Sequence, residues 1–408
     1  VRIYPNKSII KQFKTWIAGT ICIYNKVIYF QSNCSEQDKN MSHFELREKF
    51  VNEMIVTRKD VSELNKELKG NRKLNGAILD SIPNPELNTW VRKVPKVVRA
   101  GAIKDYCTSI KAAFENLKRG NIASFKMNYR KYINDPAFHI EKQANSVSNG
   151  KYIKLFPSIL KKAKIYNPCI LVNKSDRQFV EKYIGKKPDQ DCKIKYEYGQ
   201  WYLIVPYQSE ITPINEVRGA CAIDPGVRTP LTLYDAERLI SMEYKKEIYN
   251  KLIKKLQLLQ SLRAIKKIRN RSYKKARYRT RKRWVNLVND MHYKCASYLV
   301  SNYKVIGLPP FKTSEMVTSS KLNKKTKLEM LNWGHFKFRT RLESKARQLS
   351  HVLKIDESYT TQSCTNCGTL KYMGSNKIYD CLTCNHKIGR DDGSARSIFM
   401  CMMHLRYV

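Results

Sequence analysis

The sequence has few acidic residues and no long apolar run. Its 35 Asp and Glu stand against 77 Lys and Arg, which gives a formal net charge of +42. A compact chain with this surplus repels itself unless a polyanion neutralises it. No stretch of eighteen consecutive apolar residues occurs, so we expect no membrane-spanning helix. Hydrophobic residues still make up 42% of the 408 positions, enough for two to four domains with cores. The composition predicts a large folded nucleic-acid-binding protein, with a membrane-surface protein as the remote alternative.

Four of the twelve cysteines form two Cys-x-x-Cys pairs separated by a thirteen-residue spacer: Cys364, Cys367, Cys381 and Cys384. Two tight turns of this kind can offer four thiolates to one tetrahedral Zn²⁺ ion, with a hairpin between them. Chance pairs or disulfides are the alternative, and the other cysteines are scattered without such spacing. The spacing therefore predicts a structural zinc ribbon over 364–385.

Carboxylates surround this ribbon, and another one ends an apolar strand far upstream. Glu357 precedes the cysteines, and Asp391 follows them. Upstream, an apolar run beginning at Gly219 ends at Asp224 and a Pro-Gly turn. Burying an uncompensated carboxylate costs several kcal/mol, and a metal ion would compensate it. A solvated aspartate at a turn is the alternative reading of Asp224.

A run of basic residues from 263 to 283 contains no acid. A solvated helix face normally mixes charges of both signs, so this run favours contact with phosphates. Tyr273 and Tyr278 could add stacking on bases. An ordinary solvated face and a nuclear-import signal remain alternatives. The twelve cations are Arg263, Lys266, Lys267, Arg269, Arg271, Lys274, Lys275, Arg277, Arg279, Arg281, Lys282 and Arg283.

The order of predicted elements divides the chain into two halves. A strand and a helix over 1–35, together with short strands over 137–216, predict a small β-barrel, and the helical segment 36–136 interrupts it. The second half, 217–363 and 386–408, reads strand–strand–helix–strand–helix–strand–ribbon–helix, which is typical of an α/β sheet with acids at strand ends.

Three boundaries in the second half follow from apolar periodicity. The pattern predicts that a helix resumes at Trp284 after the basic run and that another covers 334–352. It then predicts a strand over Leu353–Asp356. The residues expected to face the core from the second of these helices are Phe336, Phe338, Leu342, Ala346 and Leu349.

Four motifs bring the residues of the second half together into a known pattern. They are Ala222-Ile-Asp-Pro-Gly226, the segment 332–345, Tyr359-Thr-Thr-Gln-Ser-Cys-Thr-Asn-Cys-Gly368 and Arg390-Asp-Asp-Gly-Ser-Ala-Arg-Ser-Ile398. In these motifs the chain resembles the RuvC-like nuclease region of the transposon-encoded TnpB family, and more closely its eukaryotic and viral relatives, the Fanzor proteins. The resemblance covers 217–408 specifically and the first half only in layout.

The resemblance implies an RNase H-like (RuvC) nuclease domain with a zinc-ribbon insert, and a wedge β-barrel interrupted by a helical recognition domain. It implies an RNA-guided DNA endonuclease whose partners are a guide RNA and double-stranded target DNA with a short adjacent motif. Asp224, Glu357 and Asp391 would hold two catalytic Mg²⁺ ions, besides one structural Zn²⁺. The implied location is the nucleus of a eukaryotic host, or viral or host cytoplasm, without secretion. A monomer that uses RNA as a scaffold is favoured over a dimer.

One departure from the family pattern concerns the second acid. TnpB-like proteins carry it directly after a strand, at Leu-Glu, whereas here Leu308 is followed by Pro309. Fanzor-type members are known for using another glutamate nearer the ribbon, and Glu357 fits that role. Glu315 and Glu343 are the alternatives.

The last motif also departs from the family pattern. Gly393 and Ser394 replace its Asn and Ala, while Asp391 keeps the motif position. The neighbouring Asp392 should point about 100° away on a helix. These losses leave two alternatives open: a catalytically inactive, RNA-guided DNA-binding protein, and a transposase or resolvase of the same fold.

Overall fold

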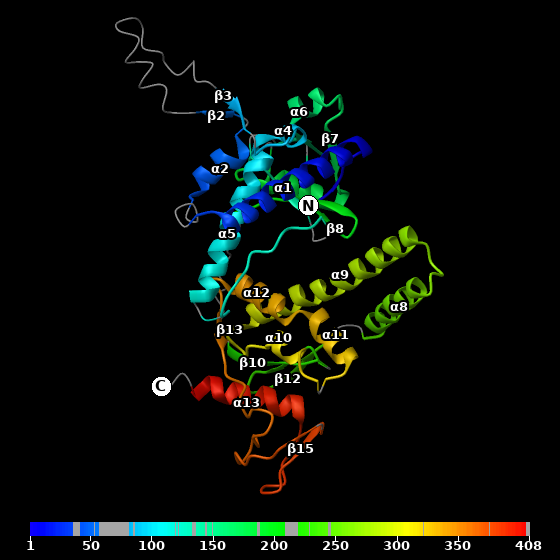
Figure 1. The fold of residues 1–408 in the computed structure, drawn as a ribbon. Coiled ribbons are helices and arrows are strands. Elements are labelled where there is room, and N and C mark those ends of the chain that lie inside the picture. Colours follow the sequence, from blue (N-terminus) through cyan, green and yellow to red (C-terminus); the bar gives the residue numbers. More distant parts are fainter. Residues whose placement is uncertain are drawn as a thin grey trace, which may run out of the picture. The chain divides into compact units, whose positions relative to one another are not determined.

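The chain folds into two compact units, Val1–Ser209 and Glu210–Val408, in the computed structural model (Figure 1). Parts of the predicted helical segment (36–40, 53 and 57–80) and the segment 209–218 lie outside the described residues. The structure describes residues 1–35, 41–52, 54–56, 81–84, 86–118, 120, 122–132, 136–142, 145–148, 150–185, 188–208, 219–227, 229–243, 246–320, 322–374 and 376–404.

The first unit contains an antiparallel seven-stranded sheet with the order β4-β8-β9-β1-β7-β6-β5. The β8–β9 hairpin turns through Tyr198 and Gly199, whose φ angles are 48° and 80°, as a two-residue hairpin turn requires. Both strands lie in the segment 137–216, over which short strands are predicted. The strands are β1 (Arg2–Tyr4), β4 (Ala137–Ile140), β5 (Asn145–Ser148), β6 (Tyr152–Leu155), β7 (Cys169–Val172), β8 (Cys192–Glu197) and β9 (Gln200–Ile204).

Helix α1 (Lys7–Asn33) contributes to two cores of this unit. Its first half buries Phe13 and Trp16 against the sheet, and its second half buries Tyr24 and Val27 against α2 and α5. The helix begins at Asn6, whose side-chain oxygen accepts a hydrogen bond from the Ile9 amide at 2.9 Å. The other elements are α2 (His43–Val51), β2 (Met54–Val56), β3 (Ser81–Pro83), α4 (Thr89–Arg92), α5 (Lys96–Lys118), α6 (Pro157–Lys162), η3 (Lys174–Asp176) and α7 (Arg177–Tyr183).

Asp105 ties α5 to the sheet. Its carboxylate lies 2.7 Å from Nε2 of His139 and 3.0 Å from Nζ of Lys193, and Arg130 donates to it at 2.9 Å. These partners outweigh its burial and hold its pKa well below the usual range. The loss of this carboxylate would leave three donors from separate segments without their shared acceptor.

The second unit is built on a five-stranded sheet with the order β12-β11-β10-β13-β14. Strand β10 is central, parallel to β13 and antiparallel to β11, and β13 is parallel to β14. The strands are β10 (Gly219–Pro225), β11 (Leu231–Tyr234), β12 (Leu239–Met242), β13 (Tyr303–Leu308) and β14 (His351–Lys354), and a separate hairpin pairs β15 (Ile378–Asp380) with β16 (Lys387–Gly389). Strand β12 is absent from the prediction.

Helices cover both faces of this sheet, with α9 and α12 on one face and α13 on the other (Figure 1). Because side chains alternate along a strand, Cys221 and Ile223 face α9, whereas Ala222 packs against Ile398 and Met402 of α13. The helices are α8 (Lys246–Ala264), α9 (Asn270–Asn302), α10 (Thr313–Met316), α11 (Lys324–Trp333), α12 (His335–Ala346) and α13 (Arg390–His404).

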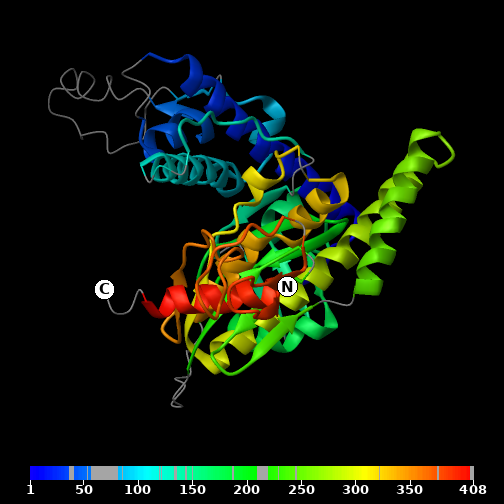
Figure 2. The ribbon, with the colours of Figure 1, turned by 90° about the horizontal axis from the view of Figure 1, so that it is seen from below.

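The helix predicted from Trp284 is present, but it begins earlier, so the predicted start is wrong. Helix α9 continues through the basic run, because Lys and Arg are good helix formers. The chain turns earlier, between α8 and α9, where Lys266 has a φ of 57°. The two helices then lie side by side (Figures 1 and 2). They pack through Tyr249 and Trp284, whose ring centroids are 4.9 Å apart.

Helix α12 is shorter than predicted, and strand β14 begins two residues earlier. The helix ends at Ala346, and Gln348 has a left-handed φ of 61° before the strand starts. Pairing with β13 then sets the register, with His351 opposite Val305. Four of the five apolar residues predicted to face the core, Phe338, Leu342, Ala346 and Leu349, do so, but Phe336 is 69% exposed. None of the described helices is long and apolar enough to cross a bilayer.

Candidate metal centres and nucleic-acid interface

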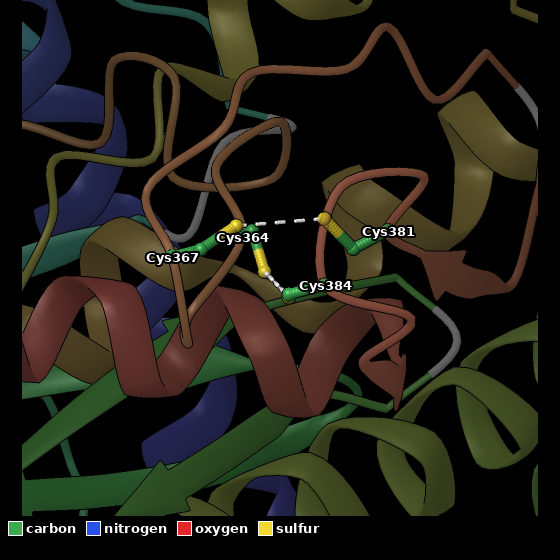
Figure 3. A group of neighbouring side chains, drawn as sticks. All are labelled: Cys364, Cys367, Cys381 and Cys384. Carbon is green, nitrogen blue, oxygen red and sulfur yellow. Dashed lines mark hydrogen bonds between the residues drawn. The ribbon is translucent and has the colours of Figure 1, made fainter.

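The four cysteines come together as the spacing predicts. Their sulfur atoms all lie within 4.8 Å of one another, and Cys364–Cys384 and Cys367–Cys381 are each 3.6 Å apart (Figure 3). A disulfide would need about 2.05 Å, whereas four sulfurs at about 2.3 Å from one tetrahedral Zn²⁺ lie roughly 3.8 Å apart. The cluster therefore fits one structural zinc ion rather than two disulfides.

The ribbon around the cluster holds its own turns with hydrogen bonds. The Tyr379 hydroxyl donates to the Thr369 carbonyl at 2.8 Å, and the Cys364 amide donates to the same carbonyl at 2.9 Å. Hydrogen bonds from the side chain and backbone of Thr369 lower the pKa of Cys367 to about 6. Metal ligation requires thiolates, and such hydrogen bonds stabilise the thiolate.

The predicted acids occupy one edge of the five-stranded sheet. Strands β10, β13 and β14 run parallel, so their carboxyl ends share that edge. Asp224 is the penultimate residue of β10, and Glu357 follows the end of β14 after two residues. Asp391 is the second residue of α13, which packs against β10. Three distant segments therefore deliver their acids to one region.

A chain of hydrogen bonds connects these segments. Asp224 lies on the same strand face as Ala222, toward α13, and the Ser394 hydroxyl of that helix hydrogen-bonds its carboxylate. The Ser394 oxygen is 3.5 Å from the Thr360 hydroxyl, which donates to the Glu357 carbonyl at 2.8 Å. Ser394 and Thr360, whose hydroxyls join β10, α13 and the segment after β14, are not among the site residues predicted from the sequence.

The charges at this edge interact. Burial raises the pKa of Asp224 to about 7, the negative charges of Asp391 and Glu357 add to the rise, and the Ser394 hydrogen bond and Arg390 oppose it. Glu357 is exposed as a residue, but protein around its carboxyl group, and then Asp356, raise its pKa. Partly buried carboxylates that lie near one another repel each other when they are charged. A bound cation would relieve this repulsion.

The acids do not yet form a closed ligand cage. Among the residues that the structure describes, the cysteines form the one group of three or more potential ligands close enough to share an ion. Asp224, Glu357 and Asp391 supply carboxylate oxygens, the donors that Mg²⁺ prefers.

The alternative glutamates have other partners. Glu315 of α10 is exposed and lies 3.5 Å from Nζ of Lys312, and Glu343 of α12 lies 3.5 Å from Nε of Arg339. Neither is among the charges that shift the pKa of Asp224 most. Asp392 turns back over Gly389, where an added Cβ would lie 2.6 Å from its Oδ2.

The basic run lies on the surface of the α8–α9 hairpin. Eleven of its twelve cations are exposed, and Lys282 is half-buried. The opposite side of the same segment buries Thr280 and Trp284. The hairpin therefore presents one strongly positive side to solvent, which fits contact with a phosphate backbone.

Comparison with known proteins finds relatives of one kind. A family model described as the Cas12f1-like TNB domain matches residues 335–398. A candidate transposase of Paramecium bursaria Chlorella virus 1 is 28% identical over 76% of this chain and 70% of its own length. Two TnpB-like proteins of Acanthamoeba polyphaga mimivirus are 26% identical over 98% of this chain and 72% and 71% of theirs.

Over nearly its whole length the chain is similar to TnpB-like proteins. This confirms the resemblance inferred from the four motifs. The matched family model runs from the start of α12 through the cysteines to Ile398, so it spans three of those motifs in part or whole.

Two solved structures also align with this chain. One is a Cas12f1–sgRNA–target DNA complex, 14% identical, covering 96% of this chain and 95% of that one at a TM-score of 0.34. The other is a CRISPR–Cas12f ternary complex, 13% identical, covering 96% and 82% at a TM-score of 0.35. Scores this low do not support a conclusion about the fold, which rests on the strand order above.

Proposed function

We propose that this protein is an RNA-guided DNA endonuclease that cuts target DNA by metal-dependent hydrolysis at a RuvC-like, RNase H-like site. The observation that carries the proposal is the gathering of Asp224, Glu357 and Asp391 at one sheet edge, linked through the Ser394 and Thr360 hydroxyls. The central strand of a mixed sheet carries the first acid, as the family resemblance implies.

Asp224, Glu357 and Asp391 would hold two Mg²⁺ ions, which, when bound, activate a water and stabilise the leaving 3′ oxygen. The protein's own groups prepare this edge. Ser394 favours the ionised form of Asp224 and fixes its orientation from α13. Thr360 holds the segment that carries Glu357 by hydrogen bonds from its amide and hydroxyl to the Glu357 carbonyl. Arg390 adds a positive charge that opposes protonation of Asp224.

The large positive net charge of the chain suits a protein that binds a large amount of nucleic acid. We assign this nucleic acid to a guide RNA and double-stranded target DNA with a short adjacent motif. Guided nucleases delegate sequence reading to base pairing and hold the heteroduplex through its backbone. The exposed cations of the α8–α9 hairpin are one place for that contact. Glu357 precedes the zinc ribbon in the sequence and Asp391 follows it, so the ribbon would position both residues.

The domain assignment follows from this proposal. The antiparallel sheet of the first unit would be the wedge domain, and α2 and α5 would belong to the helical recognition domain inserted in it. The second unit would be the nuclease domain. A monomer in the nucleus of a eukaryotic host, or in viral or host cytoplasm, suits a chain that uses RNA as its scaffold.

The test is to purify the protein from cells, sequence its co-purified RNA, and assay nicking of supercoiled plasmid bearing a matching target with and without Mg²⁺. We expect one discrete RNA species and Mg²⁺-dependent cutting. Glu357→Gln should abolish cutting and retain RNA binding, whereas the matched variants Glu315→Gln and Glu343→Gln should cut normally. Cutting lost in Glu315→Gln and kept in Glu357→Gln would show that the second acid is misassigned.

A second candidate function is a guided DNA-binding protein without cutting activity. Two observations favour it: Pro309 replaces the expected acid, and the three carboxylates are not within reach of one ion in this structure. Discrete RNA and target binding without any Mg²⁺-dependent nicking would select this function.

A further inference from the structure

A cavity of about 460 Å³ opens at the same sheet edge as the acids. Its volume lies in the range of roughly 300–1,000 Å³ that small-ligand sites occupy. Pro225, which directly follows Asp224, forms part of its wall, and so do residues just beyond β13 and the first turns of α12. The residues that matter here are Pro225, Leu308, Pro309, Phe311, Leu331 and Phe336.

The wall of this cavity is apolar where the family resemblance implies a carboxylate. Pro309 stands at the position of the missing acid and lines the cavity. Phe336 and Leu331 are 69% and 58% exposed, although both are large and apolar. Exposed aromatic and aliphatic side chains around a hollow mark a binding site more often than a core defect.

His335 lies in the wall of the cavity, and its ring nitrogens are enclosed by protein. Its Nδ1 accepts from the Trp333 indole at 2.8 Å, which leaves the proton on Nε2. Nε2 is buried and, among the described residues, has no hydrogen-bond partner. Burial lowers the pKa of His335 to about 3, so the ring is neutral. Phe311 stacks on this imidazole with ring centroids 3.9 Å apart. The neutral imidazole and the Phe311 ring therefore form an uncharged part of the wall.

The charges around the cavity argue against a phosphate as its occupant. Lys312 lies 3.5 Å from Glu315, and Arg339 lies 3.5 Å from Glu343, so both nearby cations are already paired. Arg339 also lies over the Phe336 ring, 5.6 Å from its centroid. The wall thus suits an uncharged aromatic ring, and its position beside Asp224 suits the base of a nucleotide next to the phosphodiester that is hydrolysed.

We propose that this cavity binds one unstacked nucleobase of the DNA strand that is cut, stacked on Phe336. The proposal rests on the proposed function, because it assigns the base to the substrate of that site. This site would bind a nucleotide next to the cut without any contribution from the metal ligands.

The test compares two metal-free probes: a deoxythymidine oligonucleotide of about twelve residues and an all-abasic oligonucleotide of the same length. Wild-type protein should bind the base-bearing probe more tightly. Phe336→Ala should weaken binding of that probe by roughly 5- to 150-fold, the range that stacking of one base spans, and change abasic binding by less than about twofold. Phe336→Tyr should restore the preference. Phe44→Ala, an exposed phenylalanine on α2, is the matched control and should behave as wild type.

The proposal is overturned if Phe336→Ala weakens both probes equally or neither, or if the base-dependent loss occurs only with a uridine RNA probe. Melting curves must show that the variant is folded, which the exposure of Phe336 favours. Because the probes need no metal, the outcomes separate: base-dependent loss without plasmid cutting removes the nuclease proposal alone, and cutting without base-dependent loss removes the nucleobase site alone.

Discussion

The raised pKa of Asp224 makes a quantitative prediction about Asp224→Asn. In the folded protein this carboxyl group has a pKa of about 7 against an ordinary value of 3.8. Between these values the folded state binds a proton that the unfolded state releases, so stability falls as pH rises. Each pK unit corresponds to about 1.36 kcal/mol, which gives about 4 kcal/mol at most between pH 4 and pH 7. Asparagine carries no charge and removes this dependence.

The assay is thermal unfolding of wild-type protein and Asp224→Asn without metal at about pH 4.5 and about pH 8. At low pH the two proteins should melt at similar temperatures, because wild-type Asp224 is protonated and neutral. At high pH the variant should be more stable by about 2–4 kcal/mol, which is roughly 4–15 °C for a unit of this size. Magnesium at pH 8 should raise the melting temperature of wild type and leave that of Asp224→Asn unchanged.

Two results would refute this reasoning. A difference in melting temperature that is the same at both pH values would mean that Asp224 is not forced toward its neutral form. A Mg²⁺ effect of equal size in both proteins would mean that the ion binds elsewhere. Glu343→Gln is the matched control, because that exposed glutamate is paired with Arg339 and should show neither effect.

Three further predictions concern other parts of the second unit. Cys381→Ser should release zinc, measured by atomic absorption, and lower the melting temperature, whereas Cys401→Ser, an exposed cysteine of α13, should do neither. Replacing Arg271, Lys275 and Arg279 by Gln should reduce the salt slope of RNA binding by about 2–3, with Lys294→Gln as the control. Gly307→Ala should destabilise the protein by about 1–3 kcal/mol in denaturant titrations, because the added Cβ would lie 2.8 Å from Sδ of Met402. Gly120 is the comparison, because an added Cβ there meets open space. Any effect of Gly120→Ala would come from its φ of 68°.

Local patterns predicted the elements whose signal is contained in adjacent residues. The apolar run ending at Asp224 predicted a central strand, and the paired cysteines predicted a cluster, because tight turns bring such pairs together whatever surrounds them. The end of α12 was placed too late, because pairing of His351 with Val305 decides where β14 begins. That contact joins residues far apart in the sequence, which periodicity does not detect.

The hydroxyls of Ser394 and Thr360 show a second limit. Ser394 was noted as a departure from the family motif, where alanine stands, but its contact with Asp224 depends on α13 packing under β10. Phe336 shows a third limit: its spacing with Phe338 and Leu342 fits a helix stripe, yet residues 336 and 338 lie about 200° apart around a helix. Only one of the two can face the sheet.

The change from acid to proline at position 309 connects these observations. Strands β13 and β14 are neighbours with parallel ends, so a carboxylate lost from the end of β13 can be replaced from the segment after β14, where Glu357 lies. The vacated position then need not be polar, and Pro309 with Phe336 forms an apolar wall beside Asp224. Under the proposed function, Glu357 would thus supply the metal ligand that position 309 lacks, and the apolar wall would be free to contact a base. The two roles are separable by experiment. Glu357→Gln should remove cutting without affecting the preference for the base-bearing probe. Phe336→Ala should remove that preference in the absence of metal.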